Sequence, residues 1–184
     1  GGTFPSSSRI GTGILIEGGS TLIQKNYFGY LDGTAIKSTS SSATISVFQN
    51  RITNVALTDT QADGIEGLGL WTITQNEINN VGISSSSESD GGSGIELRSS
   101  SGVSSGNTIR NNNVYNNAVA GVHILNGVSN TQVGKNILYG NGTNFSSSTP
   151  KKGAGVKLSS PTSSAQQGIR ISNNSMYDNH GLSI

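Results

Sequence analysis

Short apolar strands recur along the chain at intervals of 22 to 34 residues. Each copy has a small residue, an aliphatic residue and a variable residue, and most copies add a second aliphatic residue. The seven copies begin at Gly13, Ala35, Gly64, Gly94, Gly121, Gly155 and Gly181. Apolar positions alternate with others, as they do in strands, and no segment keeps the 3.6-residue period of a helix. The pattern predicts an all-β repeat protein.

A second pattern follows each of the first six copies. It consists of a β-branched residue, two spacers, an Asn, one spacer and another apolar residue. Because the two patterns stay in phase through loops of different length, they mark the coils of a solenoid. Stacking such coils about 4.8 Å apart pairs each strand with its neighbours and encloses a continuous core. We predict a single domain over residues 1–184, with six to seven coils and without end caps of its own.

The Asn of the second pattern predicts an inward ladder of stacked side chains. Asn tolerates the left-handed backbone of a sharp corner, and stacked amides hydrogen-bond to one another along the axis. The alternative, that these amides bind a ligand, is less favoured because amide ladders are an expected device in stacked strands. The six positions are Asn26, Asn50, Asn76, Asn112, Asn136 and Asn174.

The Gly-Ile-x-Leu and Ile-x-x-Asn-x-Val patterns over residues 12–184 resemble the coils of the pectate-lyase-like superfamily. The resemblance implies a right-handed, single-stranded parallel β-helix. That superfamily contains polysaccharide lyases, polygalacturonases, epimerases, phage tailspikes and non-catalytic surface proteins, so the fold alone does not choose an activity. The same resemblance implies an extracellular or cell-surface location.

Composition excludes several classes of function. Charged residues make up 11 % of the chain and the formal net charge is +1, which argues against nucleic-acid binding. The chain has no Cys, so disulfides and thiolate sites are excluded, and no apolar stretch is long enough for membrane insertion. The residues at the two ends, Gly1 and Ile184, do not resemble finished termini, so we expect a segment of a longer protein.

Alternation also predicts one outward residue on the first strand of each coil. Five consecutive members of this column carry ionisable or imidazole groups, which is a high concentration for so weakly charged a chain. We expect Glu66 and Glu96 to be neighbours about 4.8 Å apart on adjacent coils. The whole column is Leu15, Lys37, Glu66, Glu96, His123, Lys157 and Ser183.

Two interpretations of this column remain open. The first is a ladder of salt bridges that joins Lys37 to Glu66, and Glu96 to Arg98 or Lys157. The second, implied by the resemblance to polyuronate lyases, is a catalytic site. There Ca²⁺ is held by Glu66 and Glu96, the base is Lys37, His123 or Lys157, and Arg98 binds a carboxylate.

Three long connections, at residues 56–63, 82–93 and 142–154, enter the first strand and form one wall of a predicted groove. Binding residues favour such loops on a rigid scaffold. Asp63 and Asp90 are candidate substrate contacts, and either one paired with Glu66 or Glu96 would suit an inverting glycoside hydrolase. Trp71 is a candidate sugar platform, with packing at a corner as its alternative.

These observations leave three functions open. The leading one is an extracellular segment that binds an acidic polysaccharide, with lyase-type cleavage as the reaction if the segment is an enzyme. The main alternative is a structural or adhesive shaft of a cell-surface, filament or phage-fibre protein. Exposed strand edges at the ends of such a shaft favour end-to-end or lateral self-association. The third is a pure glycan-binding module.

Overall fold

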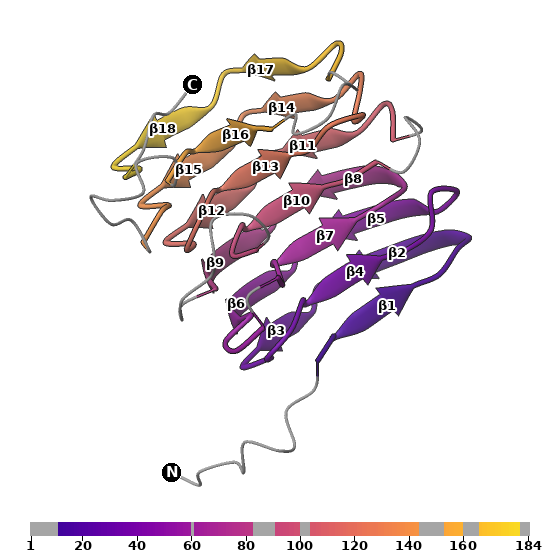
Figure 1. Ribbon diagram of the computed structural model, residues 1–184, viewed down its shortest axis with the longest axis horizontal. Coiled ribbons are helices and arrows are strands. Elements are labelled where there is room, and N and C mark those ends of the chain that lie inside the picture. The colour runs from indigo at the N-terminus through magenta and orange to yellow at the C-terminus, as the bar shows by residue number, and fades with distance from the viewer. Residues whose placement is uncertain are drawn as a thin grey trace, which may run out of the picture.

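The fold is a stack of three-stranded coils. The computed structural model describes residues 11–59, 61–82, 91–99, 104–143, 153–159 and 166–180. Eighteen strands in these ranges form three parallel sheets of six strands, and successive coils stack from the indigo to the yellow end (Figure 1). These ranges hold no helix, and thus none able to span a membrane. The predicted parallel β-helix is confirmed.

Each coil contributes one strand to each sheet. Sheet A contains the predicted first strands: β1 (Ile14–Ile16), β4 (Ile36–Ser38), β7 (Ile65–Gly67), β10 (Ile95–Leu97), β13 (Val122–Ile124) and β16 (Val156–Leu158). Sheet B contains β2 (Ser20–Gln24), β5 (Thr44–Phe48), β8 (Leu70–Thr74), β11 (Thr108–Arg110), β14 (Gln132–Gly134) and β17 (Arg170–Ser172). Sheet C contains β3 (Tyr27–Gly29), β6 (Arg51–Val55), β9 (Glu77–Val81), β12 (Asn113–Tyr115), β15 (Ile137–Tyr139) and β18 (Ser175–Tyr177). The seventh predicted strand, which begins at Gly181, lies outside the described residues.

The core is a set of aliphatic columns that run along the axis. In sheet A, the first residue of each strand points inward, so that Ile65 pairs with both Ile36 and Ile95. In sheets B and C, the middle residue of a three-residue strand points inward, as Ile109 and Val114 do. These side chains belong to one buried cluster that reaches through the coils. A coil has no core without its neighbours, which is why the register is fixed.

The predicted Asn ladder is confirmed at the corner between sheets B and C. Each side-chain amide donates to the next Oδ1 along the axis, at distances of 2.9 to 3.1 Å. The same Oδ1 also accepts the backbone N–H of the preceding ladder residue, as Asn112 does for Asn76 at 2.9 Å. Every ladder residue except those at the two ends therefore bonds to both neighbouring coils.

The reason given for Asn at this corner was partly wrong. The left-handed backbone belongs to the residue before each ladder Asn, where φ is between 54° and 57°. Those positions are Lys25, Gln49, Gln75, Asn111, Lys135 and Asn173. Asn is selected at the ladder position by its paired donor and acceptor, whereas the corner conformation is adopted by an exposed polar neighbour.

A second ladder was not predicted. Asn117 donates to Asn141 and Asn141 donates to Asn179, both at 2.9 Å, at the corner that follows sheet C. Each of the three follows a residue of the first ladder by five positions. The equivalent position in the third coil is Val81. Because the second ladder occupies only the later coils, its pattern recurs fewer times than that of the first ladder and is easily missed in the sequence.

Three tyrosines stack on the outer side of sheet C. Tyr115 and Tyr139 have ring centroids 4.7 Å apart, and Tyr139 and Tyr177 have centroids 5.0 Å apart, with nearly parallel planes. The spacing follows the coil repeat, since β12, β15 and β18 pair in register. The ring faces therefore cover one another and add side-chain stacking to the backbone hydrogen bonds.

Candidate functional site

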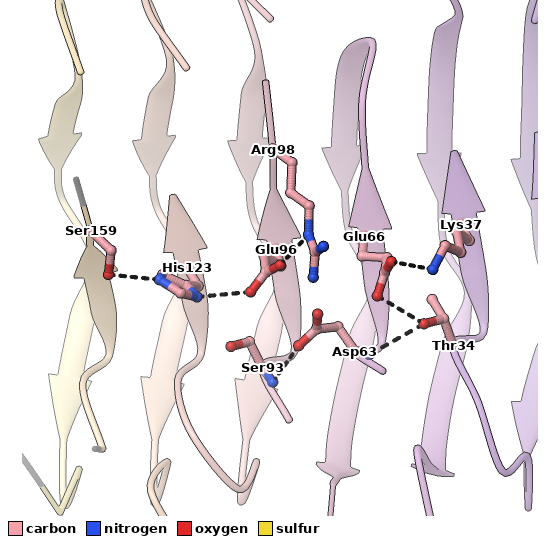
Figure 2. Close-up of polar contacts among 9 residues, drawn as sticks. All are labelled: Thr34, Lys37, Asp63, Glu66, Ser93, Glu96, Arg98, His123 and Ser159. Carbon is pink, nitrogen blue, oxygen red and sulfur yellow. Dashed lines mark hydrogen bonds and ion pairs between the residues drawn. The ribbon is translucent and has the colours of Figure 1, made fainter. Parts of the chain in front are cut away.

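The middle residues of the sheet A strands lie side by side as predicted. Glu66 pairs in register with Lys37 on one side and with Glu96 on the other. His123 pairs with Glu96 on one side and with Lys157 on the other. Figure 2 shows four of these side chains, together with their polar partners, in a row across adjacent strands. The register is set by the inward aliphatic residues of the same strands.

Three members of the column are buried, although they were expected to face solvent. The exposed fractions are 2 % for Glu66, 1 % for Glu96 and 3 % for His123. The side chains of Lys37 and Arg98 are 39 % and 38 % exposed. Each buried carboxylate therefore lies behind a cation that solvent can reach.

Glu66 is bound on both of its carboxylate oxygens. The Lys37 ammonium lies 2.7 Å from Oε1, and the Thr34 hydroxyl donates to Oε2 at 3.0 Å (Figure 2). The same Thr34 oxygen accepts the backbone N–H of Asp63 at 3.3 Å. Thr34 and Asp63 occupy the turns that lead into β4 and β7, so the connections supply the partners of the column.

Glu96 is also bound on both oxygens. Arg98 donates from Nε to Oε1 at 2.5 Å, and the His123 Nδ1 lies 2.8 Å from Oε2 (Figure 2). The other ring nitrogen of His123, Nε2, lies 2.8 Å from the hydroxyl of Ser159. The pairs Lys37–Glu66 and Glu96–Arg98 confirm the predicted ladder of salt bridges.

Asp63 is a buried carboxyl group beside this network. Burial raises its pKa well above the usual value of 3.8, and the charges of Glu96 and Glu66 raise it further, against the opposing effects of the Ser93 N–H and of Arg98. That N–H donates to Oδ1 at 2.7 Å, whereas Oδ2 has no hydrogen-bond partner. Burial alone would lower the pKa of Arg98, but the surrounding carboxylates raise it, so the guanidinium stays charged.

Replacing Asp63 with Asn should stabilise the protein at neutral pH. A carboxyl group whose pKa is raised on folding favours the folded state below its unfolded pKa, and this contribution is lost as pH rises through the folded pKa. The Asn retains an Oδ1 acceptor for Ser93 and carries no charge. We expect the Tm of the wild type to fall relative to Asp63→Asn as pH increases from about 4, in thermal melts from pH 4 to 8. An unchanged difference across this range would contradict the raised pKa, and the exposed Asp59→Asn is the matched control.

The calcium expectation is not supported. Glu66 and Glu96 are neighbours as predicted, but Lys37, Thr34, Arg98 and His123 occupy their oxygens. Within the described ranges, no group of three or more His, Cys, Asp or Glu side chains is arranged to hold a metal ion. A hard cation would have to displace an ammonium and a guanidinium, and it would then have two carboxylates for six or more ligand positions.

Trp71 is not a sugar platform. It is fully buried in the core, where its backbone pairs with Ile45, and its indole Nε1 donates to the carbonyl oxygen of Leu68 at 3.1 Å. The predicted alternative, packing, is what the structure shows. Asp90, the other candidate substrate contact from a loop, lies outside the described residues.

A surface hollow of about 510 Å³ lies away from this column, across the corner between sheets B and C. Its lining includes Tyr27, Arg51 and Glu77, and Arg51 lies 3.5 Å from Glu77. These side chains are partly or largely exposed, and the charges of Arg51 and Glu77 are paired with each other. The buried titratable groups lie on sheet A, so sheet A is the better candidate site.

Three hydroxyl residues of the site were missed by the sequence analysis. Thr34 and Ser93 each stand two residues before a strand of sheet A, in the position that Asp63 occupies before β7. Ser159 directly follows β16. The sequence did contain a signal for them, which is their position. Each is a polar residue in a turn beside a sheet A strand, and its coil adjoins one that carries a charged or imidazole member of the column.

Residues 6–175 match the family described as "NosD: Periplasmic copper-binding protein (NosD)". The chain belongs to the NosD family. This family has the right-handed parallel β-helix fold, so the superfamily-level resemblance is confirmed for the fold, and a pectate-lyase-like specificity is not. No curated protein and no solved structure is significantly similar to the chain.

The residues present do not fit the copper site that the family description implies. Copper favours thiolate, thioether and imidazole ligands, and the chain has no Cys, one Met and two His. Both ring nitrogens of His123 already contact other side chains. In the part of the chain that the structure describes, no cluster of metal-ligating residues assembles. Copper binding is therefore named in the family's description, and the described residues of this chain do not support it.

Proposed function

We propose that the outer face of sheet A binds an acidic polysaccharide outside the cytoplasm. The observation that carries this proposal is the layering of charge, with partly exposed Lys37 and Arg98 in front of buried Glu66 and Glu96. A ligand that approaches this face meets N–H donors before it meets carboxylates. Ammonium and guanidinium groups form their strongest hydrogen bonds with carboxylate oxygens such as those of uronates.

The family description supports the compartment. Its word "periplasmic" agrees with the predicted location at the coarse level of the cell envelope, where polysaccharides are abundant. Lys157 continues the row beyond His123 and extends the cationic side chains across the coils. A row of this kind suits a linear polymer, because its charges repeat along one direction as the strands do.

Binding is favoured over lyase-type cleavage. A lyase needs a basic nitrogen that can reach the C5 proton, but at two of the three predicted bases the nitrogens contact other side chains: the Lys37 nitrogen contacts Glu66, and the Nε2 of His123 contacts the Ser159 hydroxyl. Cleavage is tested directly by the ultraviolet absorbance of an unsaturated uronate. Its appearance on alginate, pectate or chondroitin would replace the binding proposal with an enzymatic one.

The binding test is titration calorimetry with oligomers of alginate, pectate and chondroitin. Losing one hydrogen bond to a charged group costs about 1.5 to 3 kcal/mol, so Lys37→Gln should weaken binding at least about tenfold. Lys37→Arg should retain most of the affinity because it keeps the charge. Added salt should weaken binding of the wild type, since partly exposed charges are screened.

The matched control is Lys135→Gln, which removes an exposed charge at the corner between sheets B and C. Gln occupies the equivalent backbone conformation at positions 49 and 75, so this change should leave both the fold and the affinity intact. Equal losses in Lys37→Gln and Lys135→Gln would show non-specific attraction and contradict a site on sheet A. Tm measurements on each variant separate loss of binding from loss of fold.

A structural shaft is the second candidate, and it is favoured by the pairing of both buried glutamates inside the protein. A network that is internally satisfied stabilises a stack of coils without any ligand. Absence of binding to acidic and neutral polysaccharides alike would leave this candidate in place. We propose that such a shaft self-associates end to end or laterally, and sedimentation at increasing protein concentration tests that association.

A further inference from the structure

Three side chains at β10, β13 and β16 of sheet A form a hydrogen-bonded chain of carboxylate, imidazole and hydroxyl. Glu96 Oε2 lies 2.8 Å from His123 Nδ1, and His123 Nε2 lies 2.8 Å from Ser159 Oγ (Figure 2). The residues come from or directly follow β10, β13 and β16. We propose that Ser159 is a nucleophile for acyl transfer, with His123 as its base and Glu96 as the group that orients the imidazole. The substrate class is a carboxylic ester.

The hydrogen bonds define the direction of proton transfer. The Glu96 carboxylate accepts from Arg98 at Oε1 and from His123 at Oε2, so the Nδ1 of His123 carries a hydrogen. In the neutral imidazole, Nε2 then has a free lone pair. That lone pair accepts the hydroxyl hydrogen of Ser159. This is the tautomer that a serine nucleophile needs, and the roles follow from geometry rather than from order in the sequence.

The site places the nucleophile nearer to solvent than its base. Ser159 is partly exposed, whereas His123 and Glu96 are buried. The backbone holds Ser159 in place, because its N–H donates to the carbonyl oxygen of Ile124 at 3.0 Å. The Gln166 amide donates to the carbonyl oxygens of Ser159 at 2.6 Å and of Ile124 at 3.1 Å. The hydroxyl is thus fixed relative to the imidazole on the neighbouring strand.

The chemistry balances with water as the only co-reactant. Ser159 Oγ attacks the ester carbonyl carbon while His123 Nε2 takes the hydroxyl proton. The bond from carbon to the alcohol oxygen then breaks, the alcohol leaves with that proton, and the acyl group remains on Ser159. Water attacks the acyl carbon, gives its proton to His123, and releases the carboxylic acid as the serine hydroxyl is restored. An ester suits this site because its leaving group is an alcohol rather than a poorer amine.

The proposal is tested with a fluorophosphonate probe, which reacts with activated serines. We expect one covalent adduct in the intact mass, located on Ser159 by peptide mapping. Ser159→Ala should remove the adduct and reduce p-nitrophenyl acetate hydrolysis at least tenfold toward the background rate. Ser40→Ala is the matched control, since the Ser40 hydroxyl also follows a sheet A strand but contacts Ser42 rather than a histidine.

Two further variants separate activation from folding. His123→Gln should slow labelling of Ser159 at least tenfold. Glu96→Gln keeps an acceptor for Nδ1 and should slow it less, with the Tm of each variant recorded. Absence of an adduct on Ser159 in the folded wild type would overturn the proposal. Equal labelling rates in the wild type and His123→Gln would also overturn it, because the imidazole would then play no part in activating the hydroxyl.

Discussion

Replacing Asn112 with Ala is expected to lower the free energy of unfolding by about 3 kcal/mol, because it leaves buried polar groups without partners. The Asn112 Oδ1 accepts both the backbone N–H of Asn76 at 2.9 Å and the Asn76 side-chain amide at 3.0 Å. Its own amide donates to the carbonyl oxygen of Ile73 at 2.9 Å and to Asn136 at 3.0 Å. Ala cannot replace any of these four bonds, and the position is buried.

The control for this prediction is the neighbouring residue. Asn111 is exposed and takes the left-handed conformation that Gln adopts at positions 49 and 75. Asn111→Gln should therefore change stability by less than about 1 kcal/mol. Urea denaturation of both variants measures the difference. A similar midpoint for Asn112→Ala and Asn111→Gln would show that the ladder contributes no more than an exposed corner residue.

The parts of the fold that could be predicted from the sequence are those that repeat with the coils. The inward aliphatic residues fix the register, and the register alone places Glu66 beside Lys37 and Glu96. The ladder was predictable for the same reason, since an Asn recurs at one offset in six coils. In both cases the same type of residue recurs at the same offset in neighbouring coils, which makes a chance pattern improbable.

The parts that could not be predicted depend on residues that do not repeat. Thr34, Ser93 and Ser159 supply partners to the site from the turns beside the strands, and the residue type at their positions changes from coil to coil. Glu66 and Glu96 are buried among the side chains that contact them from neighbouring strands and turns, which alternation within a strand does not describe. Trp71 is similar, because an aromatic residue next to a glycine-rich turn is compatible with either a platform or a core position.

The description of the NosD family names copper binding, whereas the side chains at sheet A of this chain form a hydrogen-bonded group without a metal site among the described residues. Imidazole, the one typical copper ligand at sheet A, belongs to a hydrogen-bonded chain from Glu96 to Ser159. A metal would need only Nε2, because Nδ1 lies against the Glu96 carboxylate, and it would have to displace the Ser159 hydroxyl from Nε2. The same geometry that disfavours a metal at His123 makes the imidazole a suitable base for a hydroxyl, so the two interpretations of His123 exclude each other.

Replacing Gly67 with Ala is expected to lower the free energy of unfolding by about 3 to 5 kcal/mol, the sum of backbone strain and overpacking. A Cβ at this position would lie 2.1 Å from the backbone oxygen of Ser38 on the adjacent strand, and the φ of +130° is one that residues with side chains rarely adopt. The backbones of β4 and β7 would have to separate beside Glu66, so its pairing with Lys37 should weaken as well. Gly18→Ala, where the nearest atom is 3.9 Å from the new Cβ, is the matched control and should change stability by less than about 1 kcal/mol. Thermal and urea denaturation measure both variants, and a Gly67→Ala protein as stable as Gly18→Ala would show that the two strands tolerate a wider separation.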